Sequence, residues 1–141
     1  MRLKIVILLI CMLLCSCGTS QESPPHKYEY DDVKDKMIDC MDVFNDKPVR
    51  YYIYYFQLTC YHCHGIKSKV ISYSLNSEIP FYFVEIKEDI GFLSHSKEET
   101  IGTNDSLKAF SMITPQLSLI EYGYIISTYI GEEEILNIIE S

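Results

Sequence analysis

The run of seven residues from Arg50 to Phe56 constrains the fold of this chain more than any other feature. Every position after Arg50 carries an apolar or aromatic side chain, and four of these residues are tyrosines. A strand whose two alternating faces are both apolar is buried on both sides. The segment 80–86 is similarly rich in aromatic and β-branched residues. We therefore expect two buried strands in an α/β protein.

The segments around these strands favour helices and a closing hairpin. Apolar spacing predicts an amphipathic helix over 30–45 and a helix after residue 60, whereas 88–104 is polar and has no clear pattern. Alternating strands and helices imply parallel pairing, and a hairpin adds an antiparallel edge. The predicted fold is a central mixed sheet of about four strands flanked by helices. The remaining expected elements are a short helix at 105–110, hairpin strands at 117–120 and 124–130, and a final helix whose solvated first turn holds Glu132 to Glu134.

The N-terminus has the pattern of an export signal. Arg2 and Lys4 precede an apolar run over 5–14, and small polar residues follow it. The run is too short to serve as a permanent membrane span, which needs roughly 20 apolar residues. We therefore expect residues 1–16 to be a signal peptide.

Leu14-Cys15-Ser16-Cys17 resembles the bacterial lipobox, although Cys15 departs from the usual residue at its position. The resemblance implies cleavage before Cys17 and a lipid on this cysteine, which would anchor the chain in a bilayer. Ordinary cleavage near Ser20 is the alternative. Residues 17–28 are polar, contain Pro24-Pro25 and read as a tether, which leaves 29–141 as one domain.

The charge of the chain argues against some classes of partner. The sequence has 12 basic and 20 acidic side chains, a formal net charge of -8. Loss of residues 1–16 would remove two basic side chains and no acidic one, leaving -10. A nucleic-acid-binding surface needs a basic patch. We therefore expect no nucleic-acid partner, and a domain that stands off an anionic membrane.

Cys60 and Cys63 lie between the first buried strand and a predicted helix. At the start of a helix, free backbone N–H groups and the helix dipole stabilise a thiolate. The second cysteine lies one turn further on, close enough to close a disulfide. We predict that Cys60 attacks a substrate and that Cys63 resolves the mixed disulfide.

These features resemble the thioredoxin superfamily over roughly residues 50–140. The resemblance rests on the strand-Cys60-x-x-Cys63-helix unit, on Thr114-Pro115 before a hairpin, and on the segment from Tyr122-Gly123 to the last helix. It implies that Pro115 is a cis-proline facing the disulfide, that Thr114 offers its backbone to an extended substrate, and that no cofactor is needed. Secreted lipoproteins of this type look like envelope thiol–disulfide proteins, and some are labelled bacteriocin-transport accessory proteins.

The sequence departs from the family pattern in the active-site loop. Thr59 replaces the usual Trp, Tyr61-His62 replaces Gly-Pro, and Tyr54 stands where cytoplasmic thioredoxins have a buried acid. His62 resembles the histidine of periplasmic disulfide oxidases. Such a His would stabilise the reduced form and make the disulfide more oxidising. The alternative for His62 is a solvated loop residue that tunes nothing.

The sequence therefore predicts a lipid-anchored, extracytoplasmic thiol–disulfide oxidoreductase. Its expected partners are cysteine-containing secreted or envelope proteins and a membrane redox protein that resets the pair. The competing hypothesis from another class is a non-catalytic adaptor for an export or bacteriocin system.

Other roles for the cysteines stay open as minor alternatives. Cys60-x-x-Cys63-His64 also matches a c-type haem attachment motif. Zinc would need about four ligands, and a purely structural disulfide would close too small a loop to stabilise much. We expect no metal site. Cys40 is expected to be a buried, inert cysteine, because a role as a third redox partner would require it to be exposed.

Overall fold

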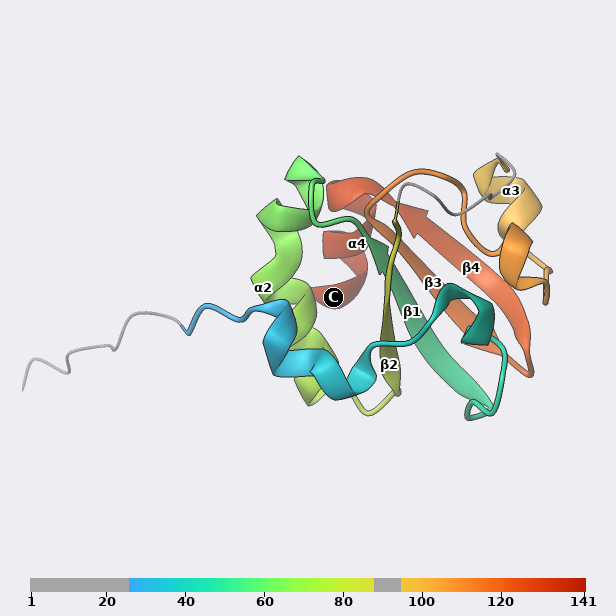
Figure 1. The fold of residues 1–141 in the computed structure, drawn as a ribbon, viewed down its shortest axis with the longest axis horizontal. Helices are drawn as coiled ribbons and strands as arrows, with labels where there is room; N and C mark the ends of the chain where they lie inside the picture. Colours follow the sequence, from blue (N-terminus) through green and yellow to red (C-terminus); the bar gives the residue numbers. More distant parts are fainter. Residues whose placement is uncertain (1–25, 88–94) are drawn as a thin grey trace, which may run out of the picture.

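The computed structural model describes residues 26–87 and 95–141 (Figure 1). The predicted signal peptide, Cys17 and most of the predicted tether lie outside the described residues. In chain order the elements, with η for a 3-10 helix, are η1 (Tyr30–Lys36), η2 (Cys40–Asp42), β1 (Arg50–Phe56), α2 (Tyr61–Asn76), β2 (Phe81–Glu85), α3 (Lys97–Thr100), η3 (Ser106–Lys108), β3 (Gln116–Glu121), β4 (Tyr124–Ile130) and α4 (Gly131–Ile139).

The four strands form one mixed sheet in the order β2-β1-β3-β4. β1 pairs in parallel with β2, placing Tyr54 opposite Phe83, and antiparallel with β3, placing Tyr54 opposite Leu117. β3 and β4 form the antiparallel hairpin at the edge. The predicted mixed sheet of about four strands is confirmed, and β1 is an interior strand, as its apolar sequence requires.

Helices and loops cover both faces of the sheet (Figure 1). Alternate residues of β1 belong to two separate cores. On one face, Tyr52, Tyr54 and Phe56 pack against α2, α4 and η1. On the other face, the core contains Tyr51, Ile53 and Tyr55 with residues of η2 and of the segment after η3. The tyrosines of β1 are therefore core residues.

The prediction of one helix over 30–45 is wrong. The chain forms η1 and η2 with an extended break between them, where Met37 bridges in parallel to Phe83. Ile38 N–H also donates to the Phe83 carbonyl at 2.9 Å. The apolar spacing suits a helix, but the backbone of β2 satisfies this segment's polar groups better as a short strand-like contact at the sheet edge.

The short helix predicted at 105–110 shrinks to η3, where Asp105 caps the turn by accepting from Leu107 N–H at 3.0 Å. The polar stretch without a clear pattern contains α3, which begins with a capping box of Ser96 and Glu99. Across the parts of the chain that the structure describes, no helix is long and apolar enough to cross a bilayer.

Candidate active site

Cys60 and Cys63 form a disulfide at the start of α2. Their Cα atoms are 5.2 Å apart, a normal separation for a disulfide. Cys60 is the N-cap residue of the helix, and its Sγ accepts from Cys63 N–H at 3.1 Å. The first turn of α2 contains no acidic residue. In the reduced protein, the same N–H and the helix dipole would stabilise a Cys60 thiolate.

The two sulfurs differ in their access to solvent. Cys63 is 1% exposed and belongs to the core between α2 and the sheet, whereas Cys60 is partly exposed. An incoming substrate can therefore reach Cys60 and cannot reach Cys63. This asymmetry in exposure is what the predicted roles require, with Cys60 as the attacking sulfur and Cys63 as the resolving one.

The segment before β3 lies beside the disulfide. The Thr114-Pro115 peptide bond is cis, and the Thr114 carbonyl oxygen lies 3.5 Å from Cys60 Sγ. The Thr114 hydroxyl donates to Gln57 Oε1 at 3.1 Å, which ties this loop to the end of β1. The structure thus brings together residues that are 54 positions apart in the sequence, as the resemblance implies.

His62 and Tyr61 lie in the first turn of α2, and both side chains point to solvent. Tyr61 is 83% exposed. His62 Nδ1 is 3.4 Å from Glu132 Oε2, at the start of α4. His64 is also exposed, and its Nε2 lies 2.6 Å from the Leu58 carbonyl oxygen, where its N–H donates.

The start of α4 completes the surroundings of the disulfide. Gly131 N–H donates to the Pro115 carbonyl at 2.9 Å, and Gly131 has a φ of +84°, a left-handed conformation that glycine adopts without a steric cost. Contacts therefore run from Cys60 through Thr114 and Pro115 to α4 and back to α2 through His62.

The structure combines three features. A strand leads into a helix that begins with two cysteines, a cis-proline faces their disulfide, and the sheet has the order β2-β1-β3-β4. The chain has the thioredoxin fold. Thioredoxin f2 of Chlamydomonas reinhardtii superposes with a TM-score of 0.50 over 74% of this chain and 92% of that one, at 12% identity. Fasciola hepatica thioredoxin gives 0.48 over 79% and 91%, at 18% identity. At 12% identity, the likeness to the Chlamydomonas protein shows the fold alone.

No protein-family model matches the sequence. The curated proteins contain no match either. The case for chemistry therefore rests on the site itself, where a disulfide within a thioredoxin fold, at a helix start, supports thiol–disulfide oxidoreductase activity.

Tyr54 stands six residues before Cys60, where the resemblance to cytoplasmic thioredoxins implies a buried acid. Its side chain is fully buried, and burial raises the pKa of its hydroxyl far above the usual range. The hydroxyl stays protonated at neutral pH and cannot take a proton from Cys63. Tyr30 packs over the same region, stacked on Phe56 with ring centroids 3.9 Å apart.

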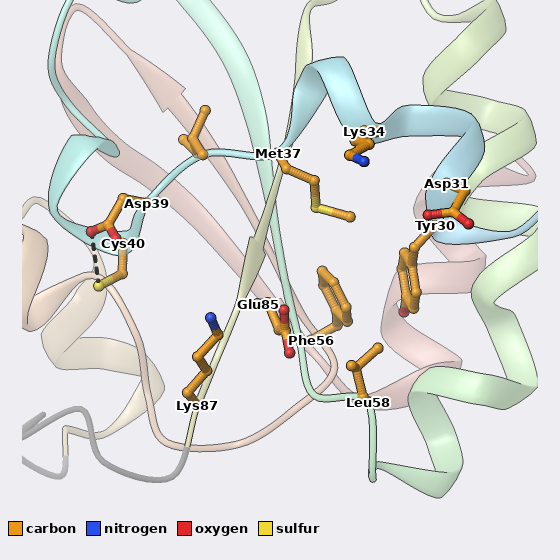
Figure 2. Close-up of a pocket in the computed structure, with 11 residues that line it drawn as sticks. Tyr30, Asp31, Lys34, Met37, Asp39, Cys40, Phe56, Leu58, Glu85 and Lys87 are labelled. Atoms are coloured by element: carbon orange, nitrogen blue, oxygen red, sulfur yellow. Dashed lines mark hydrogen bonds between the residues drawn. The ribbon is translucent and has the colours of Figure 1, made fainter.

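Cys40 is a free thiol in the core of the opposite sheet face, 7% exposed. Burial, and then the Asp39 carboxylate 3.5 Å from its sulfur, raise the pKa of this thiol. Cys40 and Leu58 lie at opposite ends of a hollow of about 470 Å³ (Figure 2). Leu58, two residues before Cys60, lies at the end of the hollow away from Cys40. Cys40 is therefore a buried thiol, as predicted, and it belongs to a different core from Cys63.

The haem and zinc alternatives fit the geometry poorly. A thioether to Cys63 would require an exposed sulfur, and this sulfur is in the core. Within residues 26–87 and 95–141, no three His, Cys, Asp or Glu side chains are grouped closely enough to hold a metal ion.

Sequence reasoning missed two residues of the site, Gln57 and Glu132. We expected Glu132 to be part of a solvated helix start, and the structure instead places it against His62. The only sequence signal for this contact is indirect: within the fold, the residue after Gly131 must lie near the cis-proline.

Proposed function

We propose that this protein is a lipid-anchored thiol–disulfide oxidoreductase that acts on secreted or envelope proteins outside the cytoplasmic membrane. The observation that carries the activity is the position of Cys60 Sγ. It lies at the N-cap of α2, is held by Cys63 N–H and faces the Thr114 carbonyl. The export signal and the lipobox-like Cys17 support the location and the bilayer attachment.

The reaction is an exchange in two steps. A Cys60 thiolate attacks one sulfur of a substrate disulfide, a mixed disulfide forms and the other substrate sulfur leaves as a thiolate. Cys63, as a thiolate, then attacks Cys60 Sγ, which releases the second substrate thiolate and closes the Cys60–Cys63 disulfide. The two thiolates take protons from water. In the reverse direction the protein donates its disulfide to a substrate dithiol.

The cis-proline loop supplies a place for an extended substrate. Pro115 shapes the wall opposite Cys60. The Thr114 backbone is close enough to Cys60 to hydrogen-bond to a substrate strand while the substrate's sulfur reacts with Cys60. Tyr61, the exposed residue that follows Cys60, offers an aromatic surface to the same segment.

A membrane redox protein must complete the cycle, because each turnover leaves Cys60 and Cys63 in the opposite redox state. Its electrons run toward this protein if the substrate is reduced and away from it if the substrate is oxidised. The reduction potential of the pair decides between these directions.

Two single substitutions test the mechanism. Cys60→Ser should abolish exchange with a disulfide substrate, because the accessible nucleophile is gone. Cys63→Ser should accumulate mixed disulfides on Cys60, because nothing resolves them. Non-reducing electrophoresis and mass spectrometry of the trapped species measure both outcomes, with Cys40→Ser as the control that removes a buried thiol. Full exchange activity in both active-site variants would overturn the mechanism.

The adaptor hypothesis draws on Tyr54, which provides no base for Cys63 where a reductase of this fold would carry an acid. An adaptor would bind its partner through the same loops and would keep its cellular function in the Cys60→Ser, Cys63→Ser double variant. Loss of function in that variant supports the enzyme.

A further inference from the structure

Glutamates gather around one hollow along α4, and their bonding distinguishes one of the four, which are Glu132, Glu133, Glu134 and Glu140. With His62 and Gly131 they line a hollow of about 770 Å³. Lys97 Nζ binds Glu134 at 2.5 Å, and Lys69 Nζ binds Glu140 at 2.7 Å. Among the described residues Glu133 has no ion-pair partner, and Glu132 is paired with His62.

The Glu132 carboxylate lies over the first turn of α2. A Cβ atom placed on Gly65 would be 3.5 Å from Glu132 Oε2 and 3.6 Å from Oε1. The glycine thus leaves one side of the carboxylate uncovered, next to the positive end of a helix that has no acid of its own in this turn. Glu132 supplies that negative charge from α4.

The backbone next to Glu132 is hydrogen-bonded to the cis-proline loop at Thr114-Pro115. Gly131 N–H donates to the Pro115 carbonyl at 2.9 Å, so the position of α4 and the position of the cis-proline are coupled. The His62–Glu132 contact spans 70 residues and closes the ring of contacts around the disulfide.

We propose that Glu132 is a positioning residue that holds the His62 ring toward α4 and thereby makes the Cys60–Cys63 disulfide less oxidising. This inference rests on the proposed thiol–disulfide function. In the oxidised protein His62 Nδ1 lies 3.4 Å from Glu132 Oε2, and the contact is an ion pair whenever the ring carries a proton. Reduction creates a thiolate at Cys60, two residues away, which competes with Glu132 for the same cation.

Without the Glu132 charge, His62 should interact with the Cys60 thiolate without a competing carboxylate. The relevant equilibrium is the reaction of the protein disulfide with two glutathione thiols, which yields the protein dithiol and one glutathione disulfide. A better-stabilised thiolate shifts this equilibrium toward the reduced protein. His62 and Glu132 are 65% and 42% exposed, so the effect is of the size of a surface ion pair, about two- to fivefold in the equilibrium constant.

The test uses the full-length chain equilibrated in glutathione buffers. Glu132→Gln should raise the equilibrium constant for reduction about two- to fivefold and should increase the thiolate fraction of Cys60 at a fixed pH. Glu133→Gln is the matched control, because it removes the same charge from the next residue of α4 without touching a His62 contact, and it should shift the equilibrium much less. Equal shifts in the two variants would overturn the proposal.

A double variant tests whether Glu132 acts through His62. In a His62→Gln background, the further change Glu132→Gln should leave the equilibrium constant unchanged. A shift of the same size as in the wild-type background would mean that Glu132 acts directly on the thiolate, and would overturn its positioning role. A wild-type chain that forms no reversible disulfide with glutathione would instead overturn the proposed function itself, and with it this inference.

Discussion

At the redox pair, the two cysteines of one helical turn differ because one lies at the helix N-cap and the other lies in the core. Cys60 Sγ has a backbone N–H donor and a neighbouring carbonyl, whereas Cys63 contacts the apolar layer beneath α2. Thiolate formation is favoured at the N-cap and disfavoured in the apolar layer. These positions support the proposed division of roles between the two sulfurs.

Tyr54 is the residue whose replacement shows whether the site uses a buried hydroxyl in place of a buried acid. Because burial raises the pKa of its hydroxyl far above the usual range, this group keeps its own proton and transfers none during exchange. The hydroxyl atom is buried and has no hydrogen-bond partner among the described residues. We expect Tyr54→Phe to keep the exchange rate and to change the free energy of unfolding by no more than about 1 kcal/mol. Stopped-flow exchange and urea unfolding measure the two quantities, and a tenfold slower exchange would show that the hydroxyl takes part.

The residues predicted from the sequence are those whose roles depend on near neighbours. Cys60, Cys63 and His62 share one helical turn, and Thr114-Pro115 is conspicuous before a strand. The contact between His62 and Glu132 could not be predicted from spacing, because it depends on how α4 packs on α2. Only the folded chain brings these two residues within 3.4 Å.

At the level of elements, the local sequence pattern predicted the strands correctly but wrongly predicted one helix over 30–45. The bounds of β1 and β4 are those expected: β1 is an apolar run buried on both faces, and β4 follows the Tyr122-Gly123 turn as the partly exposed edge strand of the hairpin. The segment 30–45 has helical spacing, yet Met37 and Ile38 bond to Phe83. A periodicity within one segment contains no information about a free sheet edge supplied by another segment.

Glu134 fastens α4 and α3 together, and its charge should make stability depend on pH. Lys97 Nζ at 2.5 Å, and then Ile130 N–H at 3.0 Å, lower the pKa of its carboxyl below 4.5. A lowered folded pKa means that the stabilisation is present above the unfolded pKa and is lost as pH falls through the folded value.

We therefore expect Glu134→Gln to lower the free energy of unfolding at pH 7 by less than about 1 kcal/mol, since the pair is largely exposed. The difference from the wild type should vanish at an acid pH well below the folded pKa of Glu134, where its carboxyl is neutral like the glutamine that replaces it. Urea unfolding at the two pH values measures this, and a difference that grows in acid would contradict the assigned pairing.

For the whole molecule, the interior position of β1 joins the sheet to the chemistry. β1 is bonded on both sides and buried on both faces, so its end delivers Cys60 to a fixed place opposite the cis-proline loop. The fold could be predicted because these strands and the two-cysteine motif are contiguous in sequence. The elements that cover the sheet face of Tyr51 and Tyr55 could not be predicted, because α3, η2 and η3 are too short to give a clear periodicity.

The proposed anchor is a property of the full chain and is tested there. In a bacterial host, Cys17→Ser should move the protein from the membrane fraction to the soluble fraction, because it would remove the site of lipid attachment. Cys15→Ser, two residues earlier, is the matched control and should leave the protein in the membrane fraction. Immunoblots of the separated fractions report the result, and a Cys17→Ser variant that stays with the membrane would contradict the anchor.

The most direct test of the account is the equilibrium of the full-length chain in glutathione buffers of graded composition. The account predicts one reversible two-electron transition that disappears in Cys60→Ser. A potential near about -120 mV would make the protein a disulfide donor, and one near about -270 mV a reductase. If Cys60 and Cys63 form no reversible disulfide across the series, the central claim that this pair carries the function is contradicted.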